Sequence, residues 1–186
     1  EQNVEGGKIL LNNKAIDQIP IHLRAEEGLG YLPQQRSVFN MSVYDNILGV
    51  AQISIKGIEK QKAITEKLLD EFNLQHLRSL NANVLSGGEL RRLMMARVMI
   101  NDPKVVLLDE PYAALDPLII QDISKYILSI QAKKTSIIVS DHNVKNLFDI
   151  VDRAYVLGSQ GVIAEGTPNE LLKSSKAVES FFGSNF

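Results

Sequence analysis

The sequence predicts an α/β fold with a mostly parallel β-sheet. Two apolar runs between polar turns, Val105–Leu108 and Ser136–Ser140, are typical of strands buried on both faces of such a sheet. The first run leads into Asp109–Glu110 and the second into Asp141–His142. Since ligands bind outside the carboxyl ends of the strands in an open α/β sheet, Asp109 and Glu110 are placed for chemistry.

Composition narrows the class of protein. With 186 residues, 45% of them apolar, the chain can bury the core of one domain, with room for a lobe. A net charge of −2 without a basic run argues against nucleic-acid binding, and the absence of cysteine excludes disulfides and thiolate metal sites. No apolar stretch approaches the roughly eighteen residues of a membrane-spanning helix. Any role at a membrane is therefore expected to depend on partners.

The first part of the chain predicts three short elements. Lys8–Ile16 is expected to form a hairpin that turns at its two adjacent asparagines. Pro20–Glu27 predicts a short helix that begins with proline, and Gly28–Gln34 predicts a strand that leaves into a loop. By its spacing alone, Gln34 would be an ordinary polar loop residue.

Residues 37–80 have a helical pattern. Ser42 and Asp45 are a candidate capping box ahead of an apolar helix face. Ser54–Gly57 interrupts the pattern, and Ile58–Leu74 predicts a second helix. The apolar face of this second helix consists of Ile64, Leu68, Leu69 and Phe72.

Ser86 and Glu89 form a further capping box, at the start of an amphipathic helix. The hydroxyl is expected to accept one otherwise unpaired N–H and the carboxylate another. Gly87 and Gly88 should each cost about 1 kcal/mol relative to alanine in this turn. We therefore expect a ligand to approach the bare backbone here, where the positive end of the helix dipole favours a phosphate.

Asp109 and Glu110 are two adjacent carboxylates that directly follow an apolar strand. Burying charged groups without partners is costly, so a purely structural role is a poor explanation for the pair. One acid can hold Mg²⁺, and the other can orient a water for attack on a phosphate.

The last part of the chain carries mostly structural signals. Asp116 is expected to cap a helix over residues 117–130 that begins with proline. Residues 153–164 predict a hairpin, and Thr167–Glu170 predicts a third capping box. A lone histidine such as His142 is usually structural or solvated.

Leu85–Glu89 and Val105–Glu110 together resemble two motifs of the ATP-binding subunits of ABC transporters. The first resembles the ABC signature, and the second resembles the Walker B strand with its catalytic glutamate. The resemblance implies a P-loop NTPase-type (RecA-like) core with a mostly parallel sheet and an inserted helical subdomain. It divides the chain into a core region ending in the glutamine loop (1–36), a helical subdomain with the signature (37–100), and a core region with Walker B, D-loop and switch histidine (101–186).

The resemblance also implies a role for each matching residue, with ATP and Mg²⁺ as cofactors. Asp109 would hold Mg²⁺ through water, and Glu110 would polarise the attacking water. Gln34 would contact the metal or that water, and His142 matches the switch histidine that contacts the γ-phosphate. The residues implied to bind the nucleotide are Ser86, Gly87, Gly88 and Glu89 of the signature and Asp116 of the D-loop.

Partners follow from the same resemblance. Two chains would form a homodimer around two ATP molecules, with each signature facing the nucleotide held by the other chain. The helical subdomain would receive the coupling helices of integral membrane permease subunits, on the cytoplasmic face of a bacterial inner membrane. Val38, Phe39 and Tyr44 in this region are open to two interpretations, core packing or partner contact.

Four further stretches favour one branch of the family, the ATP-binding subunits of lipopolysaccharide exporters. The most telling is Ser140–Val144, and the others are Gly28–Gln34, Ser42–Asn46 and Arg153–Val156. Branched-chain amino-acid importer ATPases are the nearest alternative. Two other interpretations stay open: an ABC ATPase that clamps nucleic acid or the ribosome, and a fragment that folds without binding ATP.

One motif of the family is absent from this sequence. No G-x-x-x-x-G-K-[ST] phosphate loop occurs in it, and residues 6–9 lack both the spacing and the hydroxyl. We expect this loop to lie upstream of Glu1. The 186-residue chain alone is then expected not to hydrolyse ATP.

Overall fold

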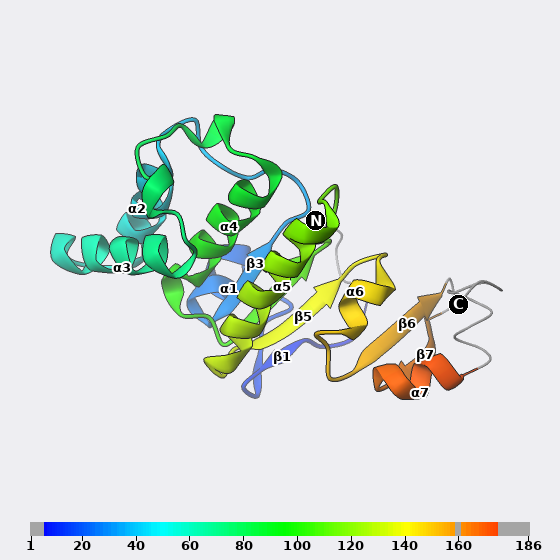
Figure 1. Cartoon of the computed structure of the whole chain (residues 1–186). Helices are drawn as coiled ribbons and strands as arrows, with labels where there is room; N and C mark the ends of the chain where they lie inside the picture. The colour runs from blue at the N-terminus through cyan, green and yellow to red at the C-terminus, as the bar shows by residue number, and fades with distance from the viewer. Residues whose placement is uncertain (1–5, 159–160, 175–186) are drawn as a thin grey trace. The chain divides into compact units, whose positions relative to one another are not determined.

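The computed structural model describes residues 6–158 and 161–174 (Figure 1). The chain divides into two compact units, Glu1–Asp141 and His142–Phe186. An apolar tail at residues 180–186, which the sequence predicts to dock on the core or on a second subunit, lies outside the described residues. The predicted division at residues 36 and 100 stays a prediction.

A three-stranded parallel sheet forms the centre of the first unit. Its order is β3 (Leu29–Leu32), β4 (Val105–Asp109) and β5 (Ser136–Ser140), so β4 is paired on both sides. Val106 and Leu108 of β4 are 1% and 2% exposed. The predicted parallel sheet is confirmed.

Burial of these strands is less complete than the sequence predicts. In β4, only alternate side chains are fully buried, and the others are half-buried. β5 was expected to be buried as well, and this expectation is wrong for the described residues, because β5 lies at the edge of the three-stranded sheet. With one neighbouring strand only, β5 leaves Ile138 61% exposed.

The elements before the sheet agree with the sequence prediction. β1 (Leu10–Leu11) and β2 (Lys14–Ala15) pair antiparallel, and the two asparagines between them have φ angles of 49° and 64°. Two consecutive positive φ angles are typical of the type I′ hairpin turn, which asparagine tolerates. α1 (Ile21–Glu26) follows, with Pro20 at its N-cap position.

Three helices form the helical part of the first unit. These are α2 (Val43–Ser54), α3 (Ile58–Glu71) and α4 (Gly87–Val98); α2 packs against both others, and α4 also packs against β3. The apolar face predicted for the second of these helices is largely confirmed, since Leu68, Leu69 and Phe72 are at most 2% exposed. Short 3₁₀ helices connect the elements at Gln75–Leu77 (η1), Ala82–Val84 (η2) and Met99–Asn101 (η3).

α5 (Pro117–Ala132) connects β4 to β5 and packs against β5 and α4. Its buried face repeats at helical spacing, with Ile120, Ile123, Ile127 and Ile130 each at most 7% exposed. A helix between two parallel strands is the usual crossover connection, which is why β4 and β5 can be neighbours in the sheet.

The three predicted capping boxes form to different extents. Those at residues 86–89 and 167–170 are complete, with both reciprocal hydrogen bonds present. At residues 42–45, the Asp45 N–H donates to the Ser42 hydroxyl (3.0 Å), but that hydroxyl donates to the Asp45 carboxylate (2.5 Å). The aspartate side chain is one methylene shorter than glutamate, so it bonds the hydroxyl instead of the N-cap backbone.

The second unit is built on a hairpin. β6 (Ala154–Gly158) and β7 (Gly161–Gly166) pair antiparallel, and α6 (Val144–Phe148) and α7 (Pro168–Lys173) accompany them. Its small core contains Val156 and Leu171, 8% and 1% exposed. The predicted hairpin and the helix after the third capping box are confirmed, while turn residues 159–160 lie outside the described part of the chain.

Asn46 is a fully buried polar side chain that fixes the loop before α2. Its amide nitrogen donates to three backbone carbonyls in this loop (3.0–3.2 Å), and its oxygen accepts from the Phe39 N–H (2.8 Å). All of its principal hydrogen-bonding groups are therefore paired within the protein, as burial requires.

We predict that Asn46→Ala lowers the free energy of unfolding by about 2–4 kcal/mol, because a fully buried amide is removed and four hydrogen bonds to the backbone of the preceding loop are lost at once. Urea denaturation measures the change. Gln52→Ala, at an exposed position of the same helix, is the control and should shift stability by less than about 0.5 kcal/mol. Equal effects of the two substitutions would contradict the prediction.

Candidate functional site

Asp109 and Glu110 lie at the carboxyl end of β4, the central strand. Asp109 is in register with Ser140 of β5, and the Glu110 N–H donates to the Ser140 carbonyl at 2.8 Å. Strand pairing therefore continues to the first residue beyond β4. Both carboxylates are half-buried at this end of the sheet.

Glu110 has a φ angle of 43°, in the left-handed region that non-glycine residues rarely adopt. This conformation costs on the order of 1 kcal/mol and is typical of functional sites. The backbone turns sharply at this residue, and its carbonyl accepts from the Ala113 N–H at 3.1 Å. Nothing in the residue pattern predicts this conformation, because glutamate is not a residue that favours it.

The structure brings Gln34 and Glu110 together, as the sequence analysis expects. The Gln34 side-chain amide donates to Oε2 of Glu110 at 2.6 Å, across 76 residues of sequence. Gln34 reaches this position because β3 is in register with β4, with Leu32 opposite Leu108. An amide donor of this kind holds the carboxylate in one orientation.

Arg91 is a buried residue that the sequence analysis did not single out. It lies in α4, is 7% exposed, and its guanidinium donates to the Pro33 carbonyl at 3.3 Å. Burial lowers the pKa of Arg91, and the charge of Asp141 opposes this shift. The helix that begins at the serine-glycine motif is thus attached to the loop that carries Gln34.

The two glycines of that motif have different surroundings. Gly87 is exposed, which leaves its backbone accessible to a ligand. Gly88 is buried, and a Cβ there would lie 2.7 Å from a methyl carbon of Ile119 in α5. The expectation that a ligand explains both glycines is therefore corrected: close packing of α4 against α5 by itself requires glycine at position 88.

Glu89 closes the capping box of α4. Its carboxylate accepts from the hydroxyl (2.7 Å) and the backbone N–H (2.8 Å) of Ser86. These hydrogen bonds lower the pKa of Glu89 below 4.5, with the hydroxyl contributing most. In this arrangement the Ser86 hydroxyl and the Glu89 carboxylate stabilise the start of the helix.

The segment after Glu110 is held by Asp141, whose carboxylate accepts from the Tyr112 N–H at 3.1 Å. Asp116 occupies the N-cap position of α5 as expected, but its side chain makes no cap bond and it is exposed. The expected side-chain cap is therefore wrong. His142 begins the second unit, so its predicted contact with a phosphate near Glu110 stays a prediction.

Asp109 is held by two hydroxyl groups that the sequence analysis also missed. Tyr31 of β3 donates to Oδ2 at 3.2 Å, and Ser140 of β5 donates to Oδ1 at 2.9 Å. The aspartate charge in turn raises the pKa of Tyr31, after the larger effect of burial. These contacts could have been predicted only from the register of the strands, which a single sequence does not give.

The donor set at this end of the sheet fits Mg²⁺. Asp109, Glu110 and Gln34 supply carboxylate and amide oxygens, which this hard cation prefers. In the described residues, no group of three or more His, Asp or Glu side chains is placed to hold a metal by itself. Such a site suits an ion that keeps several waters and takes further ligands from a substrate phosphate.

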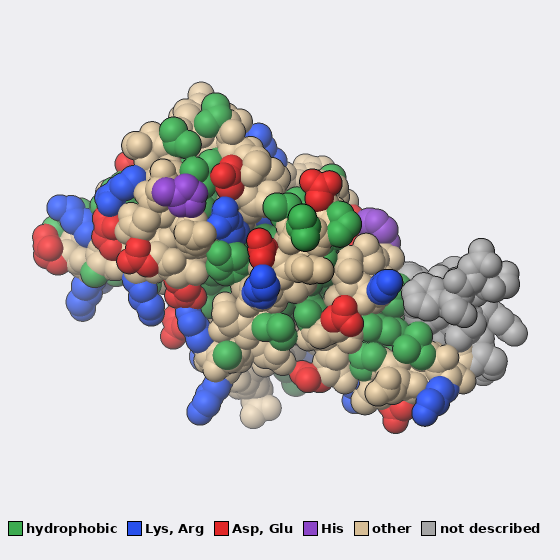
Figure 2. Space-filling view, viewed as in Figure 1, with side chains coloured by type: hydrophobic (Ala, Val, Ile, Leu, Met, Phe, Trp, Pro, Cys, Tyr) green, Lys and Arg blue, Asp and Glu red, His purple; other side chains and the backbone are tan. Residues whose placement is uncertain are grey.

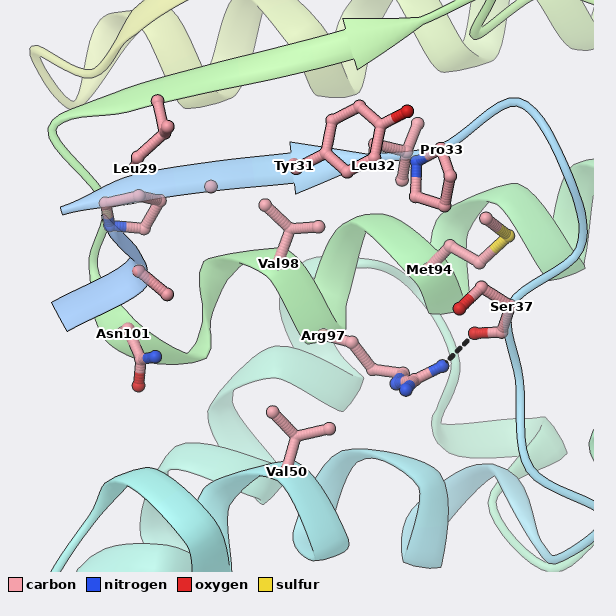
Figure 3. A pocket seen from close by; sticks show the side chains of 13 residues that line it. Leu29, Tyr31, Leu32, Pro33, Ser37, Val50, Met94, Arg97, Val98 and Asn101 are labelled. Atoms are coloured by element: carbon pink, nitrogen blue, oxygen red, sulfur yellow. Dashed lines mark hydrogen bonds between the residues drawn. The ribbon is translucent and has the colours of Figure 1, made fainter. Parts of the chain in front are cut away.

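A cavity of about 220 Å³ lies between β3, α4 and α2 (Figure 3). Arg97 extends into it from α4, donates to the Ser37 carbonyl, and lies 4.7 Å from the centre of the Phe39 ring. Burial lowers the pKa of Arg97, and its buried Nε has no hydrogen-bond partner among the residues that the structure describes. Phe39 is 47% exposed, so simple core packing does not account for it.

Charged side chains are interspersed on the helical part of the first unit. Figure 2 shows basic and acidic groups side by side there, and α3 carries charges of both signs along its length. On the face of the described residues that Figure 2 shows, the basic groups do not form a continuous stripe of the kind that follows a nucleic-acid backbone. Within the described residues, none of the helices combines the length and the hydrophobicity that spanning a membrane requires.

Comparison with known proteins gives consistent matches. The model of the ABC transporter family matches residues 1–113. The lipopolysaccharide export system ATP-binding protein LptB is 37% identical in Haemophilus influenzae, over 97% of this chain and 76% of that protein, and 37% identical in Escherichia coli K12, over 98% and 76%. An uncharacterized ABC transporter ATP-binding protein of Rhizobium meliloti is 35% identical over 98% and 68%.

Solved structures agree with this result. The ADP conformation of MJ1267, an ATP-binding cassette of an ABC transporter, superimposes with a TM-score of 0.83 at 26% identity, over 97% of this chain and 78% of that one. The protein cbiO1 of Clostridium perfringens, part of the ABC transporter complex cbiONQ, gives a TM-score of 0.82 at 27% identity, over 94% of this chain and 71% of that one. The fold predicted from the sequence is thereby confirmed.

We predict that Glu89 makes the stability of the protein depend on pH. Because its pKa is lowered in the folded state, its contribution is present above the ordinary carboxyl pKa and is lost as the pH falls through the lowered value. Glu89→Gln keeps an acceptor for the box but does not titrate.

The measurement is urea denaturation of the wild type and of Glu89→Gln at about pH 6 and about pH 3. At the higher pH, the wild type should be more stable than Glu89→Gln. At the lower pH, this difference in the free energy of unfolding should be smaller. Glu26→Gln, at an exposed position in α1, serves as the control. A difference that stays constant between the two pH values would contradict the prediction.

Proposed function

The chain belongs to the ABC transporter family, and we propose that it is the ATP-hydrolysing subunit of a transporter that exports lipopolysaccharide. The observation that carries the choice of substrate is the 37% identity to LptB over 97% of this chain. The observation that supports hydrolysis is the 2.6 Å contact between Gln34 and Glu110 at the carboxyl end of the sheet.

In this proposal, Glu110 polarises the water that attacks the γ-phosphate of ATP. The Gln34 amide keeps the carboxylate facing the open end of the sheet. The carboxylate can therefore accept a proton only from a water that lies on that side. Asp109 would hold Mg²⁺, which when bound would supply positive charge to the phosphates. Glu110 and Gln34 would set the position of the nucleophile.

The start of α4 would bind the γ-phosphate held by a second copy of the chain. The exposed backbone of Gly87 and the positive end of the helix dipole suit a phosphate oxygen. Ser86 and Glu89 keep this helix end formed through the capping box. Gly88 contributes its backbone N–H and the close packing against α5. The working unit in this proposal is therefore a homodimer.

Two further residues complete the proposed nucleotide site. Asp116 is exposed at the start of α5, and its side chain is not used as a helix cap, which leaves it for contacts across the dimer. His142 would contact the γ-phosphate through its imidazole, as the resemblance implies. In place of the serine that the family most often has before the Ala-Leu-Asp of the D-loop, this chain has Ala113.

We further propose that the cavity between β3, α4 and α2 is part of the surface for the membrane subunits. Phe39, whose ring contacts the cavity-lining Arg97, is an exposed aromatic side chain, a type of residue that is enriched at protein interfaces. Movement of a partner there would act on the segment after Gln34. The protein would lie on the cytoplasmic face of a bacterial inner membrane.

We predict that Glu110→Gln, in the transporter expressed from its natural gene, lowers kcat for ATP by about 10²–10⁴-fold, the usual contribution of a general base. The KM for ATP should change little, because the substitution keeps the size of the side chain. The assay is steady-state phosphate release. Glu165→Gln, in β7 of the second unit, is the matched control, and equal activities of the two variants would contradict the role of Glu110.

The 186-residue chain alone is expected to release no phosphate in this assay, because its sequence contains no phosphate loop. ATP turnover by this chain alone would contradict that expectation.

We predict that Phe39→Ala lowers the amount of membrane subunits that co-purify with the protein by about tenfold or more, since removal of a residue that is a hot spot of an interface costs about 2 kcal/mol or more. Ile53→Ala, at an 84% exposed position at the end of α2, is the control. Unchanged recovery with Phe39→Ala would argue that Phe39 only packs against Arg97.

The substrate is tested by depleting the protein in its own bacterium. The proposal predicts that lipopolysaccharide accumulates in the inner membrane while uptake of radiolabelled leucine is unaffected. Loss of leucine uptake with normal lipopolysaccharide would favour the amino-acid importer instead. Recovery of the protein with nucleic acid rather than with membrane subunits would favour the clamp.

A further inference from the structure

We propose that the hydroxyl groups of Tyr31 and Ser140 are positioning groups that orient the Asp109 carboxylate for its metal-bound water. The inference rests on the proposed role of Asp109 in holding Mg²⁺. Tyr31 donates to Oδ2 at 3.2 Å and Ser140 donates to Oδ1 at 2.9 Å. Each oxygen of the carboxylate is thus held from a different strand.

Strand register explains why these two side chains reach the same group. Ser140 lies directly opposite Asp109 in the β4–β5 pair. Tyr31 lies opposite Leu107, two residues before Asp109, and therefore points to the same face of the sheet. The diagonal distance from Tyr31 to Asp109 is within reach of a long aromatic side chain but not of a short one.

The direction of the tyrosine side chain agrees with this role. Figure 3 shows the Tyr31 hydroxyl directed toward the carboxyl end of its strand and away from Arg97. The ring is half exposed, so burial in a core does not explain why a large side chain occupies this position. The hydroxyl is the part of the side chain that makes the specific contact.

With two hydroxyl donors bound, the Asp109 carboxylate can still accept further hydrogen bonds. An ionised carboxylate has about four acceptor positions on its two oxygens, and Tyr31 and Ser140 use two of them. The remaining positions can accept from water on a metal ion. The side chain is therefore held in one orientation before the metal arrives, as metal ligands commonly are by their outer hydrogen-bond partners.

The test measures Mn²⁺ binding, with ATP present, by electron paramagnetic resonance on the protein expressed from its natural gene. Tyr31→Phe removes only the hydroxyl and is expected to raise the Mn²⁺ dissociation constant about tenfold, the lower end of the range for such partners. Ser140→Ala should act in the same direction, and Ser140→Thr, which keeps a hydroxyl, should stay near the wild type.

Tyr155→Phe is the matched control, because Tyr155 is 54% exposed in β6 and its ring faces Arg153. Its dissociation constant should equal that of the wild type. At saturating Mn²⁺, kcat of Tyr31→Phe should return to within about twofold of the wild type, because a positioning residue acts on metal binding. A purely structural role would instead lower stability without a metal-dependent recovery.

Asp109→Asn separates failure of this inference from failure of the proposed function. If Asp109→Asn weakens Mn²⁺ binding and Tyr31→Phe does not, the metal role stands and the positioning role is wrong. If Asp109→Asn leaves Mn²⁺ binding unchanged, the proposed role of Asp109 itself is wrong. The double variant Tyr31→Phe with Ser140→Ala should deviate from the product of the single effects, because both hydroxyls act on one carboxylate.

Discussion

Pairing of β4 with a parallel strand on each side is the constraint on which the rest of the first unit depends. It places Asp109 and Glu110 at a shared edge with the end of β3, from which Gln34 follows, and with Ser140 of β5. The left-handed turn at Glu110 begins where this pairing ends, and a backbone hydrogen bond to Ser140 fixes its first residue. A shift of register by one residue would move every side chain of the shifted strand to the other face of the sheet. The contacts to Asp109 would then be lost.

α4 connects this edge to the remainder of the unit. At its beginning, the capping box and the packing of Gly88 on Ile119 fix the helix against α5. One turn later, Arg91 bonds the backbone of the loop that carries Gln34. Further along, Arg97 bonds the Ser37 carbonyl and contacts Phe39. One helix therefore contacts the proposed phosphate-binding end, the loop that carries Gln34 and the proposed partner surface.

Local signals predicted much of the fold, because caps, turns and helix periodicity depend on neighbours in sequence. The boxes at Ser86 and Thr167, the asparagine turn and the parallel strands all form. Contacts between residues far apart in the sequence could not be predicted in the same way. The burial of β5 depends on how many strands flank it, the fixing of Asp109 by Tyr31 depends on register, and the reason for glycine at position 88 depends on a side chain of α5. The meeting of Gln34 and Glu110 was expected only through family resemblance.

The most direct test of the central claim is a structure of the Glu110→Gln variant, expressed from its natural gene, with ATP and Mg²⁺ bound. The account predicts two copies of the chain, with the Gly87 N–H of one copy on the γ-phosphate bound to the other. It also predicts the side chain at position 110 within hydrogen-bond distance of a water in line with that phosphate. ATP bound away from the carboxyl end of β4, or a side chain at position 110 turned away from the phosphate, would contradict it.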